Sequence, residues 1–131
     1  MKKVSIKTGM LATELGYRDS NDMWLFKSTI SGVLYGTNTK GGISGKEKTF
    51  KQPTQTELQS WLRKKHKIEV VAVPHKTSGV RDYRPMVKVP AFDIDFDLIL
   101  NHRLNTYEKA MEYGLKLALD FIKNRTKYIK E

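Results

Sequence analysis

Residues 54–73 read TQTELQSWLRKKHKIEVVAV, and this stretch decides the fold. Thr54 and Glu57 have the spacing of a capping box, in which each side chain binds a backbone N–H that the first turn of a helix leaves free. The apolar residues that follow at helical spacing are Leu58, Trp61 and Leu62. We therefore expect an amphipathic helix that begins at Thr54 and ends in basic residues, which the helix dipole favours at that end.

A strand is expected directly after this helix, because β-branched residues dominate residues 68–73 and Pro74 then ends it. Residues 77–79 have the composition of a turn, and residues 83–89 form a return strand. Pro85 lies inside that strand and predicts an edge position in the sheet. Residues 92–98 alternate apolar and acidic side chains, which is the pattern of a half-buried strand.

A last helix is predicted to begin near Asn105 or Thr106 and to end at Asn124 and the basic tail. Its apolar stripe consists of Tyr107, Met111, Leu115, Ala118 and Ile122. The order helix, strand, strand, strand, helix predicts an α+β fold, in which helices pack on one face of a small antiparallel sheet.

The residues before Thr54 predict less structure. A short helix is expected over residues 8–16, with Thr8 as its cap and Gly16 at its end. Its predicted inward residues are Met10, Leu11 and Leu15. Residues 23–26 read as a buried strand, and residues 36–52 as an exposed Gly/Ser/Thr-rich loop. With 131 residues and no linker or repeat, the chain is predicted to form a single domain over residues 1–131.

The composition of the chain limits its cell compartment and the partners that it can bind. The chain has no Cys, which excludes disulfides and thiolate zinc sites, and it has no apolar run of the length that spans a bilayer. No apolar region follows the basic N-terminus, so a signal peptide is not expected. We predict a cytoplasmic protein in a reducing compartment, without a membrane partner. The net charge of +10 attracts polyanions such as nucleic acid or an acidic protein.

Catalytic patterns are absent from the sequence. His66, His75 and His102 lie in different segments without zinc-ligand spacing, and there is no nucleophile elbow. The loop with Lys40 and Lys46 fails as a phosphate-binding P-loop, because Lys40 stands where glycine is required and Glu47 where a hydroxyl is required. It is either a basic loop that closes over an anion or a surface loop. We therefore expect no enzyme, no catalytic residue, no cofactor and no metal.

Asp93, Asp95 and Asp97 occupy one face of the predicted strand, about 6.6 Å apart. Aspartates so placed can hold Mg²⁺ in a nuclease site. The same pattern is also that of the solvated face of an amphipathic strand, or of acids paired with basic neighbours. All three interpretations stay open at this point.

A set of basic and aromatic residues in the central region is the better candidate site, since Arg and Tyr together pair with phosphates and stack on bases. The set consists of Arg63, Lys64, Lys67, His75, Lys76, Arg81, Tyr83 and Arg84. Lys40 and Lys46 would add charge from the loop.

Two resemblances bear on function. Residues 53–68, PTQTELQSWLRKKHKI, together with residues 106–110, TYEKA, resemble segments of small uncharacterised proteins of phages and gut-bacterial mobile elements. That resemblance implies a phage or prophage origin, and with it the cytoplasm of a bacterial host cell. The element order is similar to that of double-stranded-RNA-binding domains, although residues 105–108 stand where those domains have a Lys-Lys pair.

The resulting hypothesis is a small basic phage-type accessory protein that binds a phosphate-bearing partner, either nucleic acid or a nucleotide. The first alternative is a protein–protein module with an acidic host or phage partner, such as an inhibitor of a host defence enzyme or a virion component. A metal-dependent nuclease is the second alternative. An exposed strand edge would also be compatible with a homo-oligomer.

Overall fold

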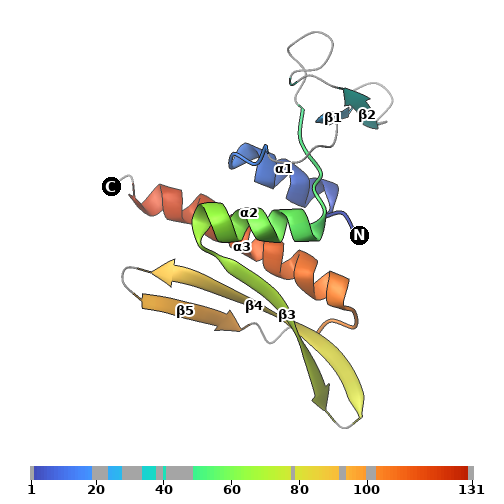
Figure 1. Ribbon diagram of the computed structural model, residues 1–131, viewed down its shortest axis with the longest axis vertical. Coiled ribbons are helices and arrows are strands. Elements are labelled where there is room, and N and C mark those ends of the chain that lie inside the picture. The colour runs from blue at the N-terminus through green and yellow to red at the C-terminus, as the bar shows by residue number, and fades with distance from the viewer. Residues whose placement is uncertain are drawn as a thin grey trace. The chain divides into compact units, whose positions relative to one another are not determined.

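The computed structural model describes residues 2–18, 24–27, 34–37, 40, 49–77, 79–91, 94–99 and 103–129 (Figure 1). For residues 26–27, 34–35, 77, 90–91, 94–99 and 125–129 it describes the backbone alone. The chain divides into two compact units. The N-terminal unit is Lys3–Pro53, and the sheet unit is Met1–Lys2 with Thr54–Glu131. The single-domain organisation stays a prediction.

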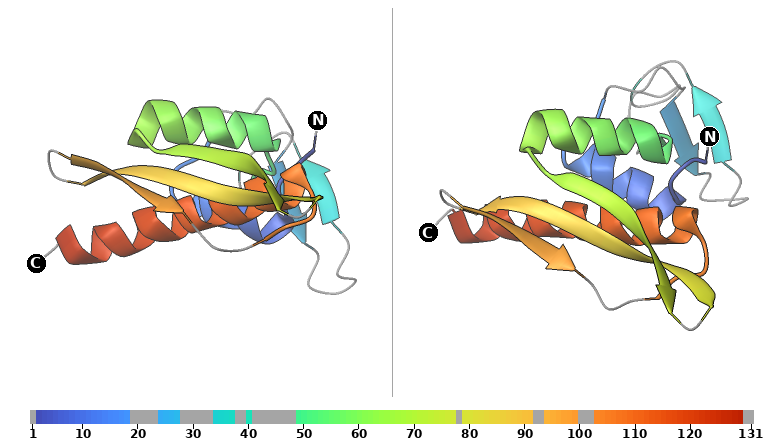
Figure 2. Two further views of the ribbon diagram at one scale, coloured as in Figure 1. Left: turned by 90° about the horizontal axis from the view of Figure 1, so that it is seen from below. Right: turned by 60° about the horizontal axis from the view of Figure 1, so that its bottom comes forward.

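The sheet unit is built on three antiparallel strands in the order β3-β4-β5. Strand β3 is Glu69–Thr77, β4 is Val80–Ala91 and β5 is Ile94–Ile99. Helix α3, Tyr107–Ile129, runs behind the strands, and α2, Gln55–His66, lies beside it (Figure 2). This arrangement confirms the α+β prediction of a small antiparallel sheet with helices packed on one face.

Helix α2 begins as its sequence predicts. The Thr54 hydroxyl accepts from the backbone N–H of Glu57 at 3.1 Å, and the Glu57 carboxylate accepts from the Thr54 N–H at 2.9 Å. The predicted apolar residues are all buried: Leu58, Trp61 and Leu62. Lys67 ends the helix in the left-handed conformation, with φ of 59°. Two amide side chains then fasten α2 to the rest of the unit, because Gln55 donates to the Glu108 carbonyl and Gln59 to the Val70 carbonyl.

Helix α3 covers the sheet through small and apolar residues. Its buried stripe contains the predicted Met111, Leu115, Ala118 and Ile122. Tyr107 was predicted to join that stripe, but it is 46% exposed because it lies in the first turn, beyond the covered part of the sheet. The helix was predicted to end at Asn124 and the basic tail through Lys130, and its end at Ile129 lies in that tail. The backbone stays helical to Ile129, since no Gly or Pro follows to break the helix.

The strands extend beyond their predicted ends. Strand β3 continues through Pro74 to Thr77, because an edge strand tolerates a residue without an N–H. Strand β4 is central, so the edge position predicted from Pro85 is wrong for the strand as a whole. Pairing with β5 begins only at Met86, however, so Pro85 itself has no β5 partner. Gly79, next to the last pair of the hairpin, has φ of 80°, which suits the predicted turn.

The N-terminal unit contains helix α1, Ile6–Glu14, and a two-stranded sheet of β1, Trp24–Lys27, and β2, Leu34–Thr37. The predicted strand is confirmed, but Trp24 and Leu25 are half-buried and not buried. Phe50 pairs with Leu25 on the same sheet. The residues of β2 fall partly within the predicted loop, whose residues 38–39 and 41–48 lie outside the described part.

The predicted start and inward face of α1 are wrong. Ser5, not Thr8, caps the helix, and its hydroxyl accepts from the Thr8 N–H at 3.2 Å. Met10 is 37% exposed, and Leu11 and Leu15 are half-buried. The buried residues are small: Thr8, Gly9, Ala12 and Thr13. Lys51 passes so close that its N–H donates to the Thr13 hydroxyl at 2.8 Å, which leaves no room for large side chains. Gly16, with φ of 110°, follows the helix end as predicted.

None of the described helices combines the length and the hydrophobicity that a membrane crossing requires.

Candidate functional site

The predicted basic set falls into two groups at opposite ends of β3. Arg63, Lys64 and Lys67 lie around the end of α2, where β3 begins. The remaining members lie at the far end of the β3–β4 hairpin: His75, Lys76, Arg81, Tyr83 and Arg84. Glu69 and Lys76 are separated along the strand by about 23 Å at the usual rise per residue. The structure therefore does not bring the eight residues into one site.

The group on α2 is partly neutralised. The Arg63 Nε atom donates to both carboxylate oxygens of Glu69, at 2.8 and 3.0 Å. The two side chains are 51% and 42% exposed, so the pair is solvated and contributes little to stability. Lys64 and Lys67 are exposed and form no ion pair with the described residues. This group resembles the solvated basic end of a helix.

The hairpin group lies on a two-stranded ribbon. Strand β3 pairs with β4 from Glu69 to Thr77, whereas β5 pairs only with residues 86–91 of β4. The part of the hairpin beyond Pro85 therefore extends past the three-stranded sheet, as Figure 1 shows. One bridge, between Tyr83 and Leu104, fastens this ribbon to the segment that leads into α3.

One face of the ribbon carries an unneutralised pair of cations. Lys76 and Arg81 are directly opposite each other in the register, and both are exposed. Neither has a carboxylate within ion-pair distance in the described part of the chain. Tyr83 shares this face, because it is two residues from Arg81 along a strand. Its ring meets Tyr107 edge-on, with ring centroids 6.2 Å apart.

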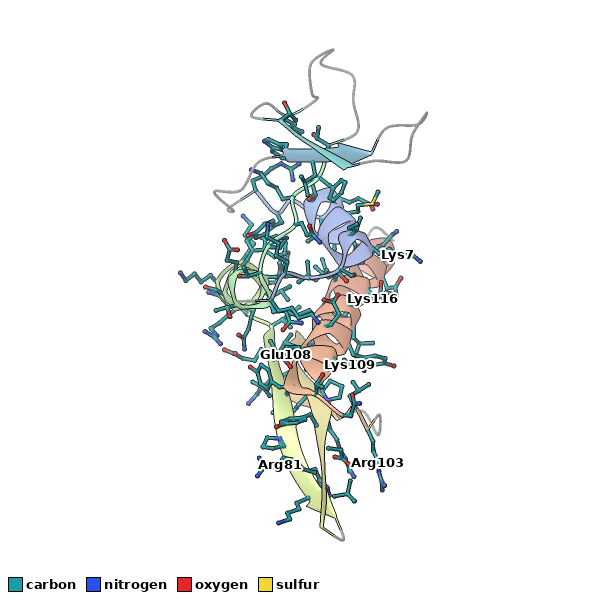
Figure 3. All side chains as sticks on the ribbon, turned by 90° about the vertical axis from the view of Figure 1, so that its right-hand side faces the viewer. Lys7, Arg81, Arg103, Glu108, Lys109 and Lys116 are labelled. Carbon is teal, nitrogen blue, oxygen red and sulfur yellow. The ribbon has the colours of Figure 1, made fainter. Side chains whose placement is uncertain are left out.

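The other face carries cations that an acid already compensates. Arg84 is three residues from Arg81 and therefore points to the opposite face. Its Nε atom lies 3.7 Å from an Asp82 carboxylate oxygen, and the Arg103 Nε atom lies 3.9 Å from the other oxygen. Figure 3 shows Arg81 and Arg103 on either side of the ribbon. His75 is opposite Asp82 in the register and completes this face.

Sequence reasoning missed two residues near the ribbon, Arg103 and Tyr107. Arg103 is in a segment without a periodic pattern, and the bridge that brings it to β4 joins residues distant in the sequence. Tyr107 fitted the helical spacing of the apolar stripe, so its exposure could not be seen from the pattern. The exposure of Tyr107 could have been predicted from its place in the first turn of the helix, which does not yet cover the sheet.

The structure describes only some of the candidate residues in the loop and in the acidic strand. Lys40 lines a pocket of the N-terminal unit, whereas Lys46 lies outside the described residues. Asp93 also lies outside them, and for Asp95 and Asp97 only the backbone is described, in register with Pro90 and Lys88. Among the described residues, no group of His, Asp or Glu is arranged to hold a metal ion.

No protein-family model, curated protein or solved structure matches the chain. The assignment of a function therefore depends on the geometry and charge of the described residues.

Proposed function

We propose that the protein binds nucleic acid through the end of the β3–β4 hairpin. The observation that carries this proposal is the exposed cross-strand pair of Lys76 and Arg81, which has no acidic partner among the described residues. Like charges placed directly opposite each other on a sheet are destabilising. A phosphate group between them would replace that repulsion with two charge-assisted hydrogen bonds.

The shape of the ribbon supports a polymeric ligand. A two-stranded ribbon has dimensions that fit a major groove, and its backbone holds the side chains of one face at regular spacing. Tyr83 and the 46% exposed Tyr107 add aromatic surface beside the cations, which suits contact with a base or sugar. The net charge of +10 would speed association with a polyanion from any direction.

The pair of Lys76 and Arg81 is a better test than Arg81 with Arg84, since Arg84 is on the other face and is compensated by Asp82. We expect the Lys76→Gln/Arg81→Gln variant to bind short oligonucleotides at least tenfold more weakly, as measured by fluorescence anisotropy. The slope of log affinity against log salt should fall by about two, one for each lost phosphate contact. Single- and double-stranded RNA and DNA of equal length would identify the preferred polymer.

A Lys65→Gln/Lys116→Gln variant is the matched control. It removes the same charge from exposed positions on α2 and α3. We expect a small, uniform loss of affinity and a nearly unchanged salt slope. Equal losses in the two double variants would show that net charge alone drives binding, and the hairpin assignment would then be wrong.

A protein partner is the second candidate, and exposed apolar residues on the other face of the ribbon favour it. Val73 is 38% and Val80 is 66% exposed, and both share the face of Arg84. An acidic protein that covered them would gain apolar burial and charge complementarity together. A Val80→Ser variant should then lose the protein partner in pull-downs from the host while nucleic-acid affinity stays unchanged. The metal-dependent nuclease remains the weakest of the three predictions.

A further inference from the structure

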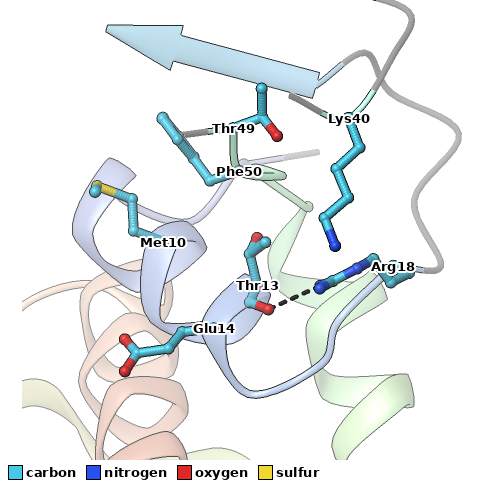
Figure 4. A pocket seen from close by; sticks show the side chains of 7 residues that line it. All are labelled: Met10, Thr13, Glu14, Arg18, Lys40, Thr49 and Phe50. Carbon is cyan, nitrogen blue, oxygen red and sulfur yellow. Dashed lines mark hydrogen bonds between the residues drawn. The ribbon is translucent and has the colours of Figure 1, made fainter. Parts of the chain in front are cut away.

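A second anion site is suggested by a pocket in the N-terminal unit, independent of the hairpin. The pocket has a volume of roughly 260 Å³. Figure 4 shows the side chains that line it: Met10, Thr13, Glu14, Arg18, Lys40, Thr49 and Phe50. Ligand sites are commonly of this kind, with apolar walls and a few convergent polar groups, and this volume is just below their usual range of roughly 300–1,000 Å³.

Arg18 is held in place by contacts that leave part of its guanidinium available. One terminal nitrogen donates to the carbonyls of Thr13 and Tyr17, both at 2.7 Å. The guanidinium carbon also lies 5.5 Å from the centre of the Trp24 ring. The other guanidinium nitrogens have no hydrogen-bond partner among the described residues. An arginine fixed in this way is pre-organised, so little entropy is lost when it binds an anion.

Lys40 approaches the same side of the pocket. Its side chain points toward Arg18, whereas the Glu14 carboxylate points away from both cations (Figure 4). Within the described part of the chain, neither Arg18 nor Lys40 has a carboxylate within 4.0 Å. Two cations that converge without a counter-ion repel each other, and an anion between them would remove that repulsion.

The Thr13 hydroxyl of the pocket is already engaged. The Thr13 hydroxyl donates to the Gly9 carbonyl at 2.9 Å and accepts from the Lys51 N–H, and Thr49 also has a partner. The positively charged groups that can recognise an anion in this pocket are Arg18 and Lys40. The opposite wall is apolar, with Phe50 and the 37% exposed Met10.

We propose that this pocket binds a small organic phosphate monoester. Two positive charges match the near-dianionic phosphate, and the planar donor fork of Arg18 suits its oxygens. The organic group would lie against Met10 and Phe50. The site does not depend on the proposed nucleic-acid binding, because its residues all belong to the N-terminal unit.

Calorimetric titration of the full chain tests the proposal, with a nucleoside monophosphate, a sugar phosphate, inorganic phosphate, a dicarboxylate and the neutral nucleoside as probes. We expect saturable binding of at least one monoester, weaker binding of inorganic phosphate and no binding of the nucleoside. The Lys40→Gln variant should bind the monoester about tenfold more weakly, the loss of one charge-assisted hydrogen bond. Lys40 is exposed and makes no hydrogen bond or ion pair with the described residues, so this variant should fold normally.

Lys7→Gln is the matched control, because Lys7 is an exposed residue of α1 that does not line the pocket. The affinity of the Lys7→Gln variant for the monoester should equal that of the unchanged protein. A Met10→Ser variant should weaken monoester binding and leave inorganic phosphate binding unchanged. The proposal is overturned by an absence of saturable phosphate binding, by equal losses in the Lys40 and Lys7 variants, or by a dicarboxylate that binds as tightly as the monoester.

Discussion

The Nε atom of Arg84 lies 3.7 Å from a carboxylate oxygen of Asp82 on the same strand, and the two side chains are 21% and 13% exposed. This is within ion-pair distance, yet neither of these two atoms has a hydrogen-bond partner. Asp82 thus compensates the charge of Arg84 without a direct hydrogen bond to it. On the other face of the hairpin, Lys76 and Arg81 have no such acid among the residues that the structure describes. The two faces of one ribbon therefore differ in electrostatic potential.

Removing this acid should change stability and affinity in opposite directions. In an Asp82→Ala variant, Arg84 stays largely buried without its counter-charge, and the free energy of unfolding should fall by about 1–2 kcal/mol. Nucleic-acid affinity should rise severalfold, because an acid next to the proposed interface is lost. Urea denaturation and anisotropy titration measure the two effects. A folded variant with weaker binding would mean instead that Asp82 positions Arg84 and Arg103 for the ligand.

Reversing one charge of the cross-strand pair should have the opposite effects to Asp82→Ala: higher stability and weaker nucleic-acid binding. A Lys76→Glu variant places an acid across from Arg81, and such pairs stabilise a sheet by about 0.2–1 kcal/mol. The same change should weaken nucleic-acid binding by more than tenfold, since repulsion from the phosphates replaces attraction. Thermal unfolding and anisotropy would be measured on the same samples.

Together with the single Arg81→Glu variant, the Lys76→Glu/Arg81→Glu double variant completes this test as a double-mutant cycle. It restores repulsion between the strands, so its stability should return toward that of the unchanged protein. Its nucleic-acid binding should be lost. If stability instead rose with each substitution, cross-strand repulsion would not be the physical basis of the site.

The close approach of α3 to the sheet gives a prediction about the core. A Cβ atom at Gly114 would lie 2.8 Å from Val70 Cγ1 and 3.4 Å from Pro85 Cβ. A Gly114→Ala variant should therefore be destabilised by about 1–2 kcal/mol, although alanine favours a helix by about 1 kcal/mol over glycine. Asn124→Ala, at an exposed position of the same helix, is the control and should be neutral or slightly stabilising in the same denaturation experiment. A stabilised Gly114→Ala protein would contradict this packing.

Most of the sheet unit could be predicted because its signals are local. The capping box of Thr54 and Glu57 and the spacing of Leu58, Trp61 and Leu62 depend only on neighbouring residues. Strand ends were harder, since they depend on the position of a strand in the sheet. Pro74 is tolerated inside β3 because β3 is an edge strand, and no local pattern contains that information.

For the candidate site, the sequence could predict the residue types but not their arrangement in space. The basic residues were identified, but the length of β3 separates Arg63 from Arg81, and the alternation of the strand turns Arg84 away from Arg81. Arg103 reaches the ribbon through a bridge between Tyr83 and Leu104, which are distant in the sequence. The convergence of Lys40 on Arg18 is likewise a product of tertiary structure.

The face of α1 was mispredicted because its packing depends on small residues, and this can be tested directly. A Cβ atom at Gly9 would lie 2.6 Å from the Lys51 carbonyl oxygen, a backbone atom that cannot rotate away. We expect a Gly9→Ala variant to lose about 2–3 kcal/mol of stability, despite the better helix propensity of alanine. Lys7→Ala, an exposed change in the same helix, should stay within about 0.5 kcal/mol of the unchanged protein. Equal stability of the two variants in urea denaturation would show that large residues of α1, rather than Gly9, Ala12 and Thr13, form the packed face.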